Sequence, residues 1–218
     1  MKVDHVFIRA GVGAPEADLL RVFGLSEGTG NRHPGQGTAN RRFFFRNAFI
    51  ELLWIADERE IVSESTRPTG LHERLSGTRG VSPFGICFRP SGSETPAPFP
   101  AWAYRPAYLP AGMSIDIGRD VPPSEPMWFF LSNGAPPVEA PPERRQALEH
   151  AAGLREITSL TVTMPGAEGG SAAALAAVES GAVSIREGGR HLIEIGFDHE
   201  VRGLAHDFRP ALPLLFRY

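Results

Sequence analysis

The sequence of 218 residues contains a single cysteine, Cys87. One thiol excludes an intrachain disulfide, so the fold does not depend on an oxidising compartment. Long apolar runs are also absent, because charged Asp4 and Arg9 interrupt the first ten residues. No stretch approaches the roughly 20 apolar residues of a membrane helix. These absences predict a cytoplasmic protein without a signal peptide or a membrane span.

An excess of positive charge is missing too. Lys and Arg number 22 against 25 Asp and Glu, which gives a net charge of −3. A nucleic-acid-binding protein normally shows a basic footprint, and this chain does not. Hydrophobic residues make up 42% of the chain, enough for an ordinary buried core. We therefore expect no nucleic-acid or membrane partner and take a small molecule as the expected ligand.

Glycine and proline, by contrast, are abundant, with 24 and 20 residues. The prolines gather at 90–110, 122–126 and 136–142. Because proline is excluded from central strands and helix interiors, these clusters mark connections between ordered elements. The patterns between them predict strands at 3–8, 41–46, 49–55, 83–89, 101–105, 113–118, 127–132, 157–164, 183–186 and 191–197. They predict helices at 16–23, in parts of 58–76, at 142–152 and at 170–179, a polar loop at 28–40, and a tail at 207–218 that packs as an edge or clasp.

Two segments of the chain echo each other. Asp4–Ile8 precedes a predicted helix and a strand ending in Phe49–Leu53, and Thr158–Val162 precedes a helix and a strand at Leu192–Gly196. The block between them has four predicted strands and no helix. This pattern divides the chain into a first βαβββ module at 1–56, a helical connection at 57–80, a helix-stripped module at 81–135 and a C-terminal βαββ partial module with its tail at 136–218.

His5 and Glu51 are the sharpest candidates for a functional pair. Each lies inside an apolar strand, where ionisable groups are seldom placed without a partner. If the two strands are neighbours, an imidazole nitrogen and a carboxylate oxygen converge, and such donors suit Zn²⁺, Mn²⁺, Fe²⁺ or Ni²⁺. The alternative is a structural His–Glu hydrogen bond, or two side chains that face solvent.

Other polar residues offer weaker signals. His33 precedes Pro34–Gly37, which can turn the chain over a pocket, and Thr38 and Asn40 can fix such a loop by hydrogen bonds. The alternative is that this segment is loop scaffolding only. Arg105 stands among aromatic residues and suits an anion, or else it stiffens a proline-rich loop. Trp128 is expected in the core or in a pocket wall.

Two features are set aside. Gly11-Val12-Gly13 resembles the start of a dinucleotide loop, but Glu16 occupies the third glycine position, where its charge opposes a pyrophosphate. Cys87 lies in the middle of a strand and is expected to be a buried, inert thiol.

The motif Asp4-His5-Val6, followed by a helix and Ile50-Glu51-Leu52, resembles the first module of the vicinal oxygen chelate superfamily. That group includes glyoxalase I, extradiol dioxygenases and bleomycin-type resistance proteins. The segments 32–41, 101–110 and 207–214 are similar to its subgroup of glyoxalase-like domain proteins. The resemblance implies an α+β fold in which paired βαβββ modules form a cupped, mostly antiparallel sheet, with the helix-stripped second module and a C-terminal partial module.

The resemblance also implies metal ligands on the first and last strands of two modules. His5 and Glu51 match these positions in the first module. The middle module offers Phe84 or Gly85 and Trp128 or Phe129, none of which binds a metal. The C-terminal module offers Ser159 and Glu194, so the implied donor set is His5, Glu51 and Glu194.

Two hypotheses follow from the resemblance. The first is a divalent-metal-dependent lyase, isomerase or dioxygenase acting on a small oxygen-rich molecule. Glu51 and His33 would then be catalytic, and Thr38, Asn40, Arg105 and Trp128 would contact the substrate. The second is a metal-free small-molecule binding or resistance protein, which the missing second ligand set favours. We also expect a homodimer, because open sheet edges need covering.

Overall fold

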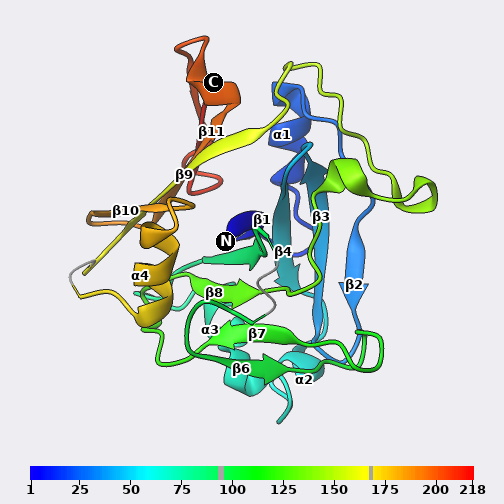
Figure 1. Ribbon diagram of the computed structural model, residues 1–218, viewed down its shortest axis with the longest axis vertical. Coiled ribbons are helices and arrows are strands. Elements are labelled where there is room, and N and C mark those ends of the chain that lie inside the picture. The colour runs from blue at the N-terminus through cyan, green and yellow to red at the C-terminus, as the bar shows by residue number, and fades with distance from the viewer. Residues whose placement is uncertain (93–95, 167–168) are drawn as a thin grey trace.

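The computed structural model describes residues 1–92, 96–166 and 169–218. It contains an eight-stranded sheet with the order β2-β3-β4-β1-β5-β8-β7-β6 and a five-stranded sheet with the order β10-β9-β11-β13-β12. In Figure 1, β2, β3 and β4 stand upright while β6, β7 and β8 run across the lower part of the view, so the larger sheet curls. The curl leaves a concave face between its two halves.

The larger sheet is built from two halves of equal strand order. Its central strands β1 (Lys2–Arg9) and β5 (Phe84–Arg89) pair antiparallel. Each central strand pairs parallel with the last strand of its own half, β1 with β4 (Phe49–Ile55) and β5 with β8 (Met127–Phe130). The remaining strands are β2 (Asn31–His33), β3 (Thr38–Phe44), β6 (Ala101–Tyr104) and β7 (Ile115–Gly118). This arrangement confirms the predicted pairing of two modules in a cupped sheet.

The two halves differ in the connection after their first strand. In the first half, α1 (Ala17–Phe23) follows β1, and Gly24 ends it in a left-handed conformation with φ of 109°. The left-handed C-cap suits glycine, which has no Cβ to clash. In the second half, the described residues between β5 and β6 contain no helix. The prediction of a helix-stripped second module is therefore confirmed for the described part of that connection.

Side-chain alternation places the strands' apolar residues on both faces of the sheet. Val6 and Ile8 pack in a core that also includes residues of the smaller sheet, whereas Phe7 packs on the concave side with Leu53. Because successive strand residues point to opposite faces, Trp128 and Phe129 also separate, and only Phe129 reaches the concave side. Trp128, expected in the core or in a pocket wall, is fully buried and packs in the core.

The connection between the halves covers the concave side. It consists of α2 (Glu58–Ile61), the short 3₁₀ turn η1 (Arg67–Thr69) and α3 (Leu71–Leu75). Ile61 and Leu71 pack in the same cluster as Phe7 and Phe129. The helical connection therefore closes a space that the curled sheet alone would leave open.

The smaller sheet repeats the start of a module. Strand β9 (Ile157–Met164) leads into α4 (Ala172–Glu179), whose N-cap Ser171 accepts a hydrogen bond from the Ala174 backbone N–H. Strands β10 (Ser184–Glu187) and β11 (Leu192–Phe197) flank β9. After the 3₁₀ turn η4 (Asp198–Glu200), the tail supplies β12 (Ala205–Asp207) and β13 (Leu214–Arg217), with β12 at the edge.

The predicted helix at 142–152 is wrong. The 3₁₀ turn η2 (Pro137–Glu139) precedes this segment, and within it only the 3₁₀ turn η3 (Pro142–Arg144) forms before a stretch without regular secondary structure. Gln146 accepts a hydrogen bond from the Thr29 N–H, and His150 accepts one from the Ser26 N–H. The backbone groups also find tertiary partners, because the Glu149 carbonyl accepts from the Ser26 hydroxyl at 2.6 Å and the Ala152 N–H donates to the Gly24 carbonyl at 3.0 Å. These contacts take the place of helical hydrogen bonds, so the local helix preference is overridden.

The segment predicted as a loop at 28–40 also differs from expectation, because it contains β2. Polar Asn31 and Arg32 form this strand at the sheet edge, where side chains face solvent and no apolar pattern is required. Among the described residues, no helix has the length and apolarity needed to cross a bilayer.

Candidate functional site

A cavity of about 180 Å³ lies on the concave face of the larger sheet. One side is polar and comes from β1–β4 and their loops, and the opposite side is apolar. We call it the central cavity. The polar lining includes His5, His33, Gln36, Asn40, Arg42 and Glu51. The apolar lining includes Phe7, Leu71, Leu109, Ile115, Met127 and Phe129. Its volume lies below the range of about 300–1,000 Å³ typical of drug-sized ligands, so a smaller molecule fits it.

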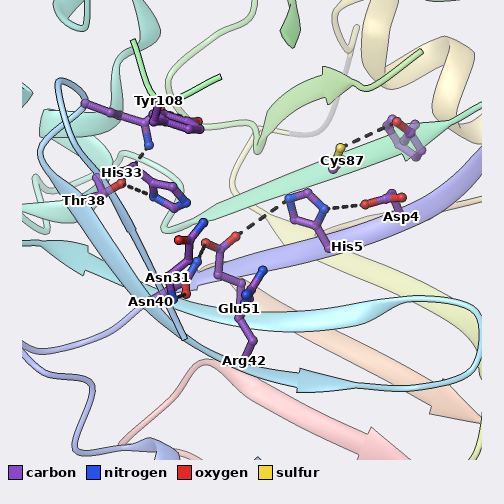
Figure 2. A network of polar contacts seen from close by, with 12 residues as sticks. Asp4, His5, Asn31, His33, Thr38, Asn40, Arg42, Glu51, Cys87 and Tyr108 are labelled. Atoms are coloured by element: carbon purple, nitrogen blue, oxygen red, sulfur yellow. Dashed lines mark hydrogen bonds and ion pairs between the residues drawn. The ribbon is translucent and has the colours of Figure 1, made fainter. Parts of the chain in front are cut away.

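His5 reaches this cavity from a β-bulge in β1. The pairing of β1 with β5 shifts between Val3 and His5, so Asp4 is the extra residue. A bulge turns side chains out of strict alternation, and here Asp4 Oδ1 lies 2.7 Å from His5 Nδ1. A carboxylate only accepts, so Nδ1 carries the proton and Nε2 presents its lone pair when the ring is neutral. Figure 2 shows the ring between Asp4 and Glu51.

The aromatic surroundings hold the His5 ring in place. It stacks on Phe49, with ring centroids 4.4 Å apart and an interplanar angle of 15°. Phe129 meets it edge-on at 5.3 Å from the other half of the sheet. Because both contacts come from large apolar side chains, the ring is fixed in orientation while Nε2 stays directed toward Glu51.

Glu51 lies on β4, beside His5 in the cavity. Its Oε2 atom is 3.8 Å from His5 Nε2, and its Oε1 accepts a hydrogen bond from Asn40 Nδ2. Asn40 is held in turn, because its Oδ1 accepts from the Asn31 backbone N–H at 2.6 Å. The side chain of Glu51 is buried. Two strands therefore orient a buried carboxylate whose second oxygen is directed at an imidazole (Figure 2).

Arg42 stands directly across the strand pair from Glu51. Its Nε donates to the Thr29 carbonyl at 2.8 Å, and its guanidinium lies 5.0 Å from the Phe44 ring centre. Burial lowers the pKa of Arg42, and the charge of Glu51 partly offsets this effect. The arginine places positive charge at the cavity without a close ion pair to Glu51 among the described residues.

His33 belongs to a second series of hydrogen-bonded polar side chains along the cavity. Its Nδ1 lies 2.8 Å from Thr38 Oγ1, which also accepts from Gln36 Nε2 at 2.7 Å. The Tyr108 hydroxyl donates to Gln36 Oε1 at 3.2 Å, and the Tyr108 ring lies 4.8 Å from that of His33. Burial is the main cause that lowers the pKa of His33. Burial therefore disfavours the cationic form of this imidazole.

A family model described as a glyoxalase-like domain matches residues 3–178. This chain belongs to the glyoxalase-like domain family. The family is part of the vicinal oxygen chelate superfamily, so the resemblance drawn from the sequence is confirmed. The glyoxalase-like chain also resembles the crystal structure of a hypothetical protein from Staphylococcus aureus, with a TM-score of 0.52 and 10% identity, covering 99% of this chain and 98% of the other. That likeness supports the fold alone. A search of curated protein sequences gave no match.

Members of this superfamily often bind divalent metals, so the donor atoms of this glyoxalase-like chain decide whether a metal fits its cavity. In the central cavity, His5 and Glu51 supply two donors 3.8 Å apart, whereas a catalytic site usually has three protein donors. The facing half offers Met127, Phe129 and Leu131. The residues therefore fit a resident metal incompletely.

Among the described residues, the group of three or more metal-type side chains that does converge is Asp4, His5 and Cys87, within 4.8 Å. Burial raises the pKa of Cys87 well above its ordinary value, and Asp4 and Glu51 act in the same direction. A thiol binds metals as thiolate, so this environment opposes binding. The Cys87 thiol instead donates to the Phe88 carbonyl at 3.6 Å.

The structure does not bring every predicted site residue to the cavity. Glu194 lies in the smaller sheet, where it pairs with Arg186 and Arg217. Arg105 is exposed and does not line the central cavity. Trp128 points to the opposite face of the sheet, where its Nε1 donates to Glu125 Oε2 at 2.8 Å. His5, His33, Asn40 and Glu51 line the cavity together, and Thr38 supports His33.

Sequence reasoning missed the roles of several cavity residues. Tyr104 and Tyr108 line the cavity on either side of Arg105, the residue selected from that segment. Alternation along β6 gave a usable signal for Tyr104, whereas Tyr108 lies on a loop without a periodic pattern. The role of Asp4 depends on the bulge, and a bulge is a property of the strand pair rather than of the local sequence.

Proposed function

We propose that this glyoxalase-like chain is an enzyme that moves a proton at a carbon next to a carbonyl or carboxyl group of a small, largely apolar molecule. The observation that carries the proposal is the placement of Asp4 at one nitrogen of His5 and of Glu51 near the other, at the polar side of the central cavity. A carboxylate that fixes one imidazole nitrogen leaves the other free to accept a proton. The reaction class is isomerase or lyase.

The roles follow from the contacts. His5 Nε2 takes the proton, and Asp4 and Glu51 stabilise the imidazolium that forms between them. The negative charge that develops on the substrate oxygen needs a donor, and Arg42 provides a guanidinium beside Glu51. The apolar wall around Phe129 and Met127 excludes water, which strengthens these electrostatic interactions. Asn40 keeps Glu51 in place.

A divalent-metal-dependent enzyme is the second candidate. The His5–Glu51 separation of 3.8 Å and the carboxylate behind the imidazole favour it, since metal-bound histidines commonly carry such a partner. His5 and Glu51 would then hold the ion, which would act as a Lewis acid on a substrate oxygen. Remaining positions would need water or substrate, because the facing wall is apolar.

The test is hydrogen–deuterium exchange. Chelator-treated protein is incubated in D₂O with a panel of small ketones, aldehydes and carboxylic acids, and deuterium incorporation at the adjacent carbon is followed by NMR. We expect incorporation into at least one compound, lost in His5→Phe and strongly reduced in Glu51→Gln. Glu194→Gln is the matched control, because it removes a buried strand carboxylate outside the cavity.

Three different outcomes of this experiment would contradict the proposal. Exchange that appears only after Zn²⁺, Mn²⁺, Fe²⁺ or Ni²⁺ is added, and is lost in the same two variants, assigns the chain to the metal-dependent candidate. A compound that binds the wild-type cavity without exchange, with or without metal, assigns it to the binding or resistance class. Exchange that survives in His5→Phe places the chemistry elsewhere.

A further inference from the structure

A second cavity of about 700 Å³ lies at the seam between the two sheets. We call it the seam cavity. The end of β1, the loop after α3, the start of β11 and the turn before β13 form its walls. Four arginines line it, namely Arg9, Arg74, Arg190 and Arg209, with Glu16 as the acidic residue in the lining. This concentration of positive charge stands out in a chain whose net charge is −3.

Arg74 is the buried member of this set, with 6% of its surface exposed. Its Nη1 donates to the backbone carbonyls of Ser82, Pro123 and Glu125 at 3.1, 3.3 and 2.6 Å. Its Nε has no hydrogen-bond partner among the described residues. Buried charges are normally paired, whereas this guanidinium is hydrogen-bonded only to neutral carbonyls. Burial lowers the pKa of Arg74 to about 10, and the charges of Glu125 and Glu73 offset that effect only in part.

The side-chain carboxylate of Glu125 already has hydrogen-bond partners other than Arg74. Glu125 accepts from Trp128 Nε1 at 2.8 Å, from the Ser171 N–H at 2.8 Å and from the Ser171 hydroxyl at 2.6 Å. Three hydrogen bonds fix its oxygens at the N-terminus of α4. Its charge partly offsets the burial of Arg74, but no ion pair between the two side chains forms among the described residues.

The other lining groups leave the positive charge in excess. Within the described part of the chain, Arg9 and Arg190 have exposed side chains with no ion pair, whereas Arg209 is paired with Asp207. Both oxygens of Glu16 accept from the Gly11 N–H, at 3.0 and 3.2 Å. His191 lies 2.8 Å from the Ser124 carbonyl, and burial is the main cause that lowers its pKa, so it adds little charge.

We propose that the seam cavity binds a small polyanion that carries at least two phosphate or carboxylate groups. Guanidinium groups recognise both kinds of oxyanion through paired N–H donors. The volume of about 700 Å³ lies within the range of small-molecule sites. Arg9 belongs to the larger sheet and Arg190 precedes β11 of the smaller one, so a bound polyanion bridges the two sheets.

The experiment measures binding to the full chain by calorimetry and by thermal unfolding at constant ionic strength. Pyrophosphate is the phosphate probe and citrate the carboxylate probe. We expect at least one of them to bind and to raise the unfolding temperature, because a ligand of the folded state stabilises it. Arg9→Gln and Arg190→Gln change exposed side chains, so folding is retained, and each should weaken binding about tenfold.

The matched control is Arg145→Gln, which removes one exposed arginine outside the cavity and should bind like wild type. Binding of pyrophosphate alone, citrate alone or both identifies the oxyanion that the site accepts. Binding of neither probe, or equal binding by wild type and both cavity variants, overturns the proposal. The Glu51→Gln protein should bind the probe normally, so this result is independent of the chemistry proposed for the central cavity.

Discussion

Glu51 and Glu194 occupy similar places in the two sheets but meet different partners. Each lies in a buried strand between aliphatic residues, in Ile50-Glu51-Leu52 and in Ile193-Glu194-Ile195. Both are buried, at 6% and 8% exposed. Glu194 contacts two arginines, with Nη1 of Arg186 at 3.2 Å and Nη2 of Arg217 at 2.7 Å. Glu51 contacts an amide and an imidazole instead.

The difference separates a structural carboxylate from a candidate catalytic one. The charge of Glu194 is neutralised by residues of its own sheet, so folding alone accounts for it. Glu51 has Asn40 and His5 as partners and faces a cavity that can take a ligand. The first strands of the two repeated segments show the same contrast. His5 on β1 points at Glu51, whereas Ser159 on β9 donates a hydrogen bond to Glu200 at 2.9 Å.

The largest effect that this comparison predicts is on proton transfer after Asp4→Asn. The amide can donate to Nδ1, which moves the His5 proton to Nε2 and removes the acceptor that faces the cavity. We expect the deuterium exchange rate to fall about 10²- to 10⁴-fold. Nitrogen NMR of the imidazole should show the change of tautomer directly.

A merely structural role for Asp4 makes a different prediction. Asp4 Oδ2 lies 3.9 Å from Arg89, so its substitution also weakens a buried charge pair. If the exchange rate fell while the His5 tautomer stayed as in wild type, Asp4 would act on stability rather than on the imidazole. Asp4→Glu should recover part of the rate, since it restores an acceptor for Nδ1.

The next effect concerns stability and should differ between the two sheets. Glu194→Gln leaves Arg186 and Arg217 without their carboxylate, and we expect a loss of about 1 kcal/mol in the free energy of unfolding. The estimate is modest because both arginine side chains are about half exposed, at 62% and 46%. Glu51→Gln should cost less or raise stability, as substitutions at functional sites often do.

Urea unfolding of the two variants measures this contrast. A double variant, Glu194→Gln with Arg217→Gln, should lose less than the sum of its single changes, because the two groups act on each other. Equal losses for Glu51→Gln and Glu194→Gln would remove the distinction between the two carboxylates. A larger loss for Glu51→Gln would assign it to the structural class.

Local sequence patterns predicted much of the fold but not the partners of these residues. The alternation in β1, β4 and β9 predicted these strands, whereas the pairing of modules in a cupped sheet was implied by the resemblance to the vicinal oxygen chelate superfamily. The helix predicted at 142–152 was wrong because backbone groups of that segment bond to distant residues, the Glu149 carbonyl to Ser26 and the Ala152 N–H to Gly24. Edge strand β2 lacks apolar residues, so alternation could not reveal it.

In the candidate site, too, local patterns identified some residues, whereas others depend on how the strands pair. His5 and Glu51 were identifiable because ionisable residues interrupt apolar strands, and the motif around His33 and Asn40 marked the loop that approaches them. Glu194 presents the same local signal as Glu51, and only the cross-strand positions of Arg186 and Arg217 distinguish it. Such positions depend on which strands pair and in which register, which short patterns do not encode.

The smallest effect expected is a pH dependence at His150, where the segment before β9 contacts the larger sheet. His150 Nδ1 accepts from the Ser26 N–H at 3.0 Å, so the proton on its neutral ring resides on Nε2, 3.0 Å from the Phe44 carbonyl. Burial is the main cause that lowers the pKa of His150 below the ordinary value of 6.5. The unfolded chain therefore binds a proton at higher pH than the folded chain, and stability falls as pH decreases through about 6.5.

Burial also lowers the pKa of His33 and His191, so these residues act in the same direction. His150→Gln should therefore flatten the decline in unfolding free energy without abolishing it. His199→Asn changes an exposed histidine whose positive φ of 59° asparagine tolerates, and it should leave the slope unchanged. An unaltered slope in His150→Gln would mean that protonation of His150 does not limit stability, and that His33 or His191 carries the acid sensitivity instead.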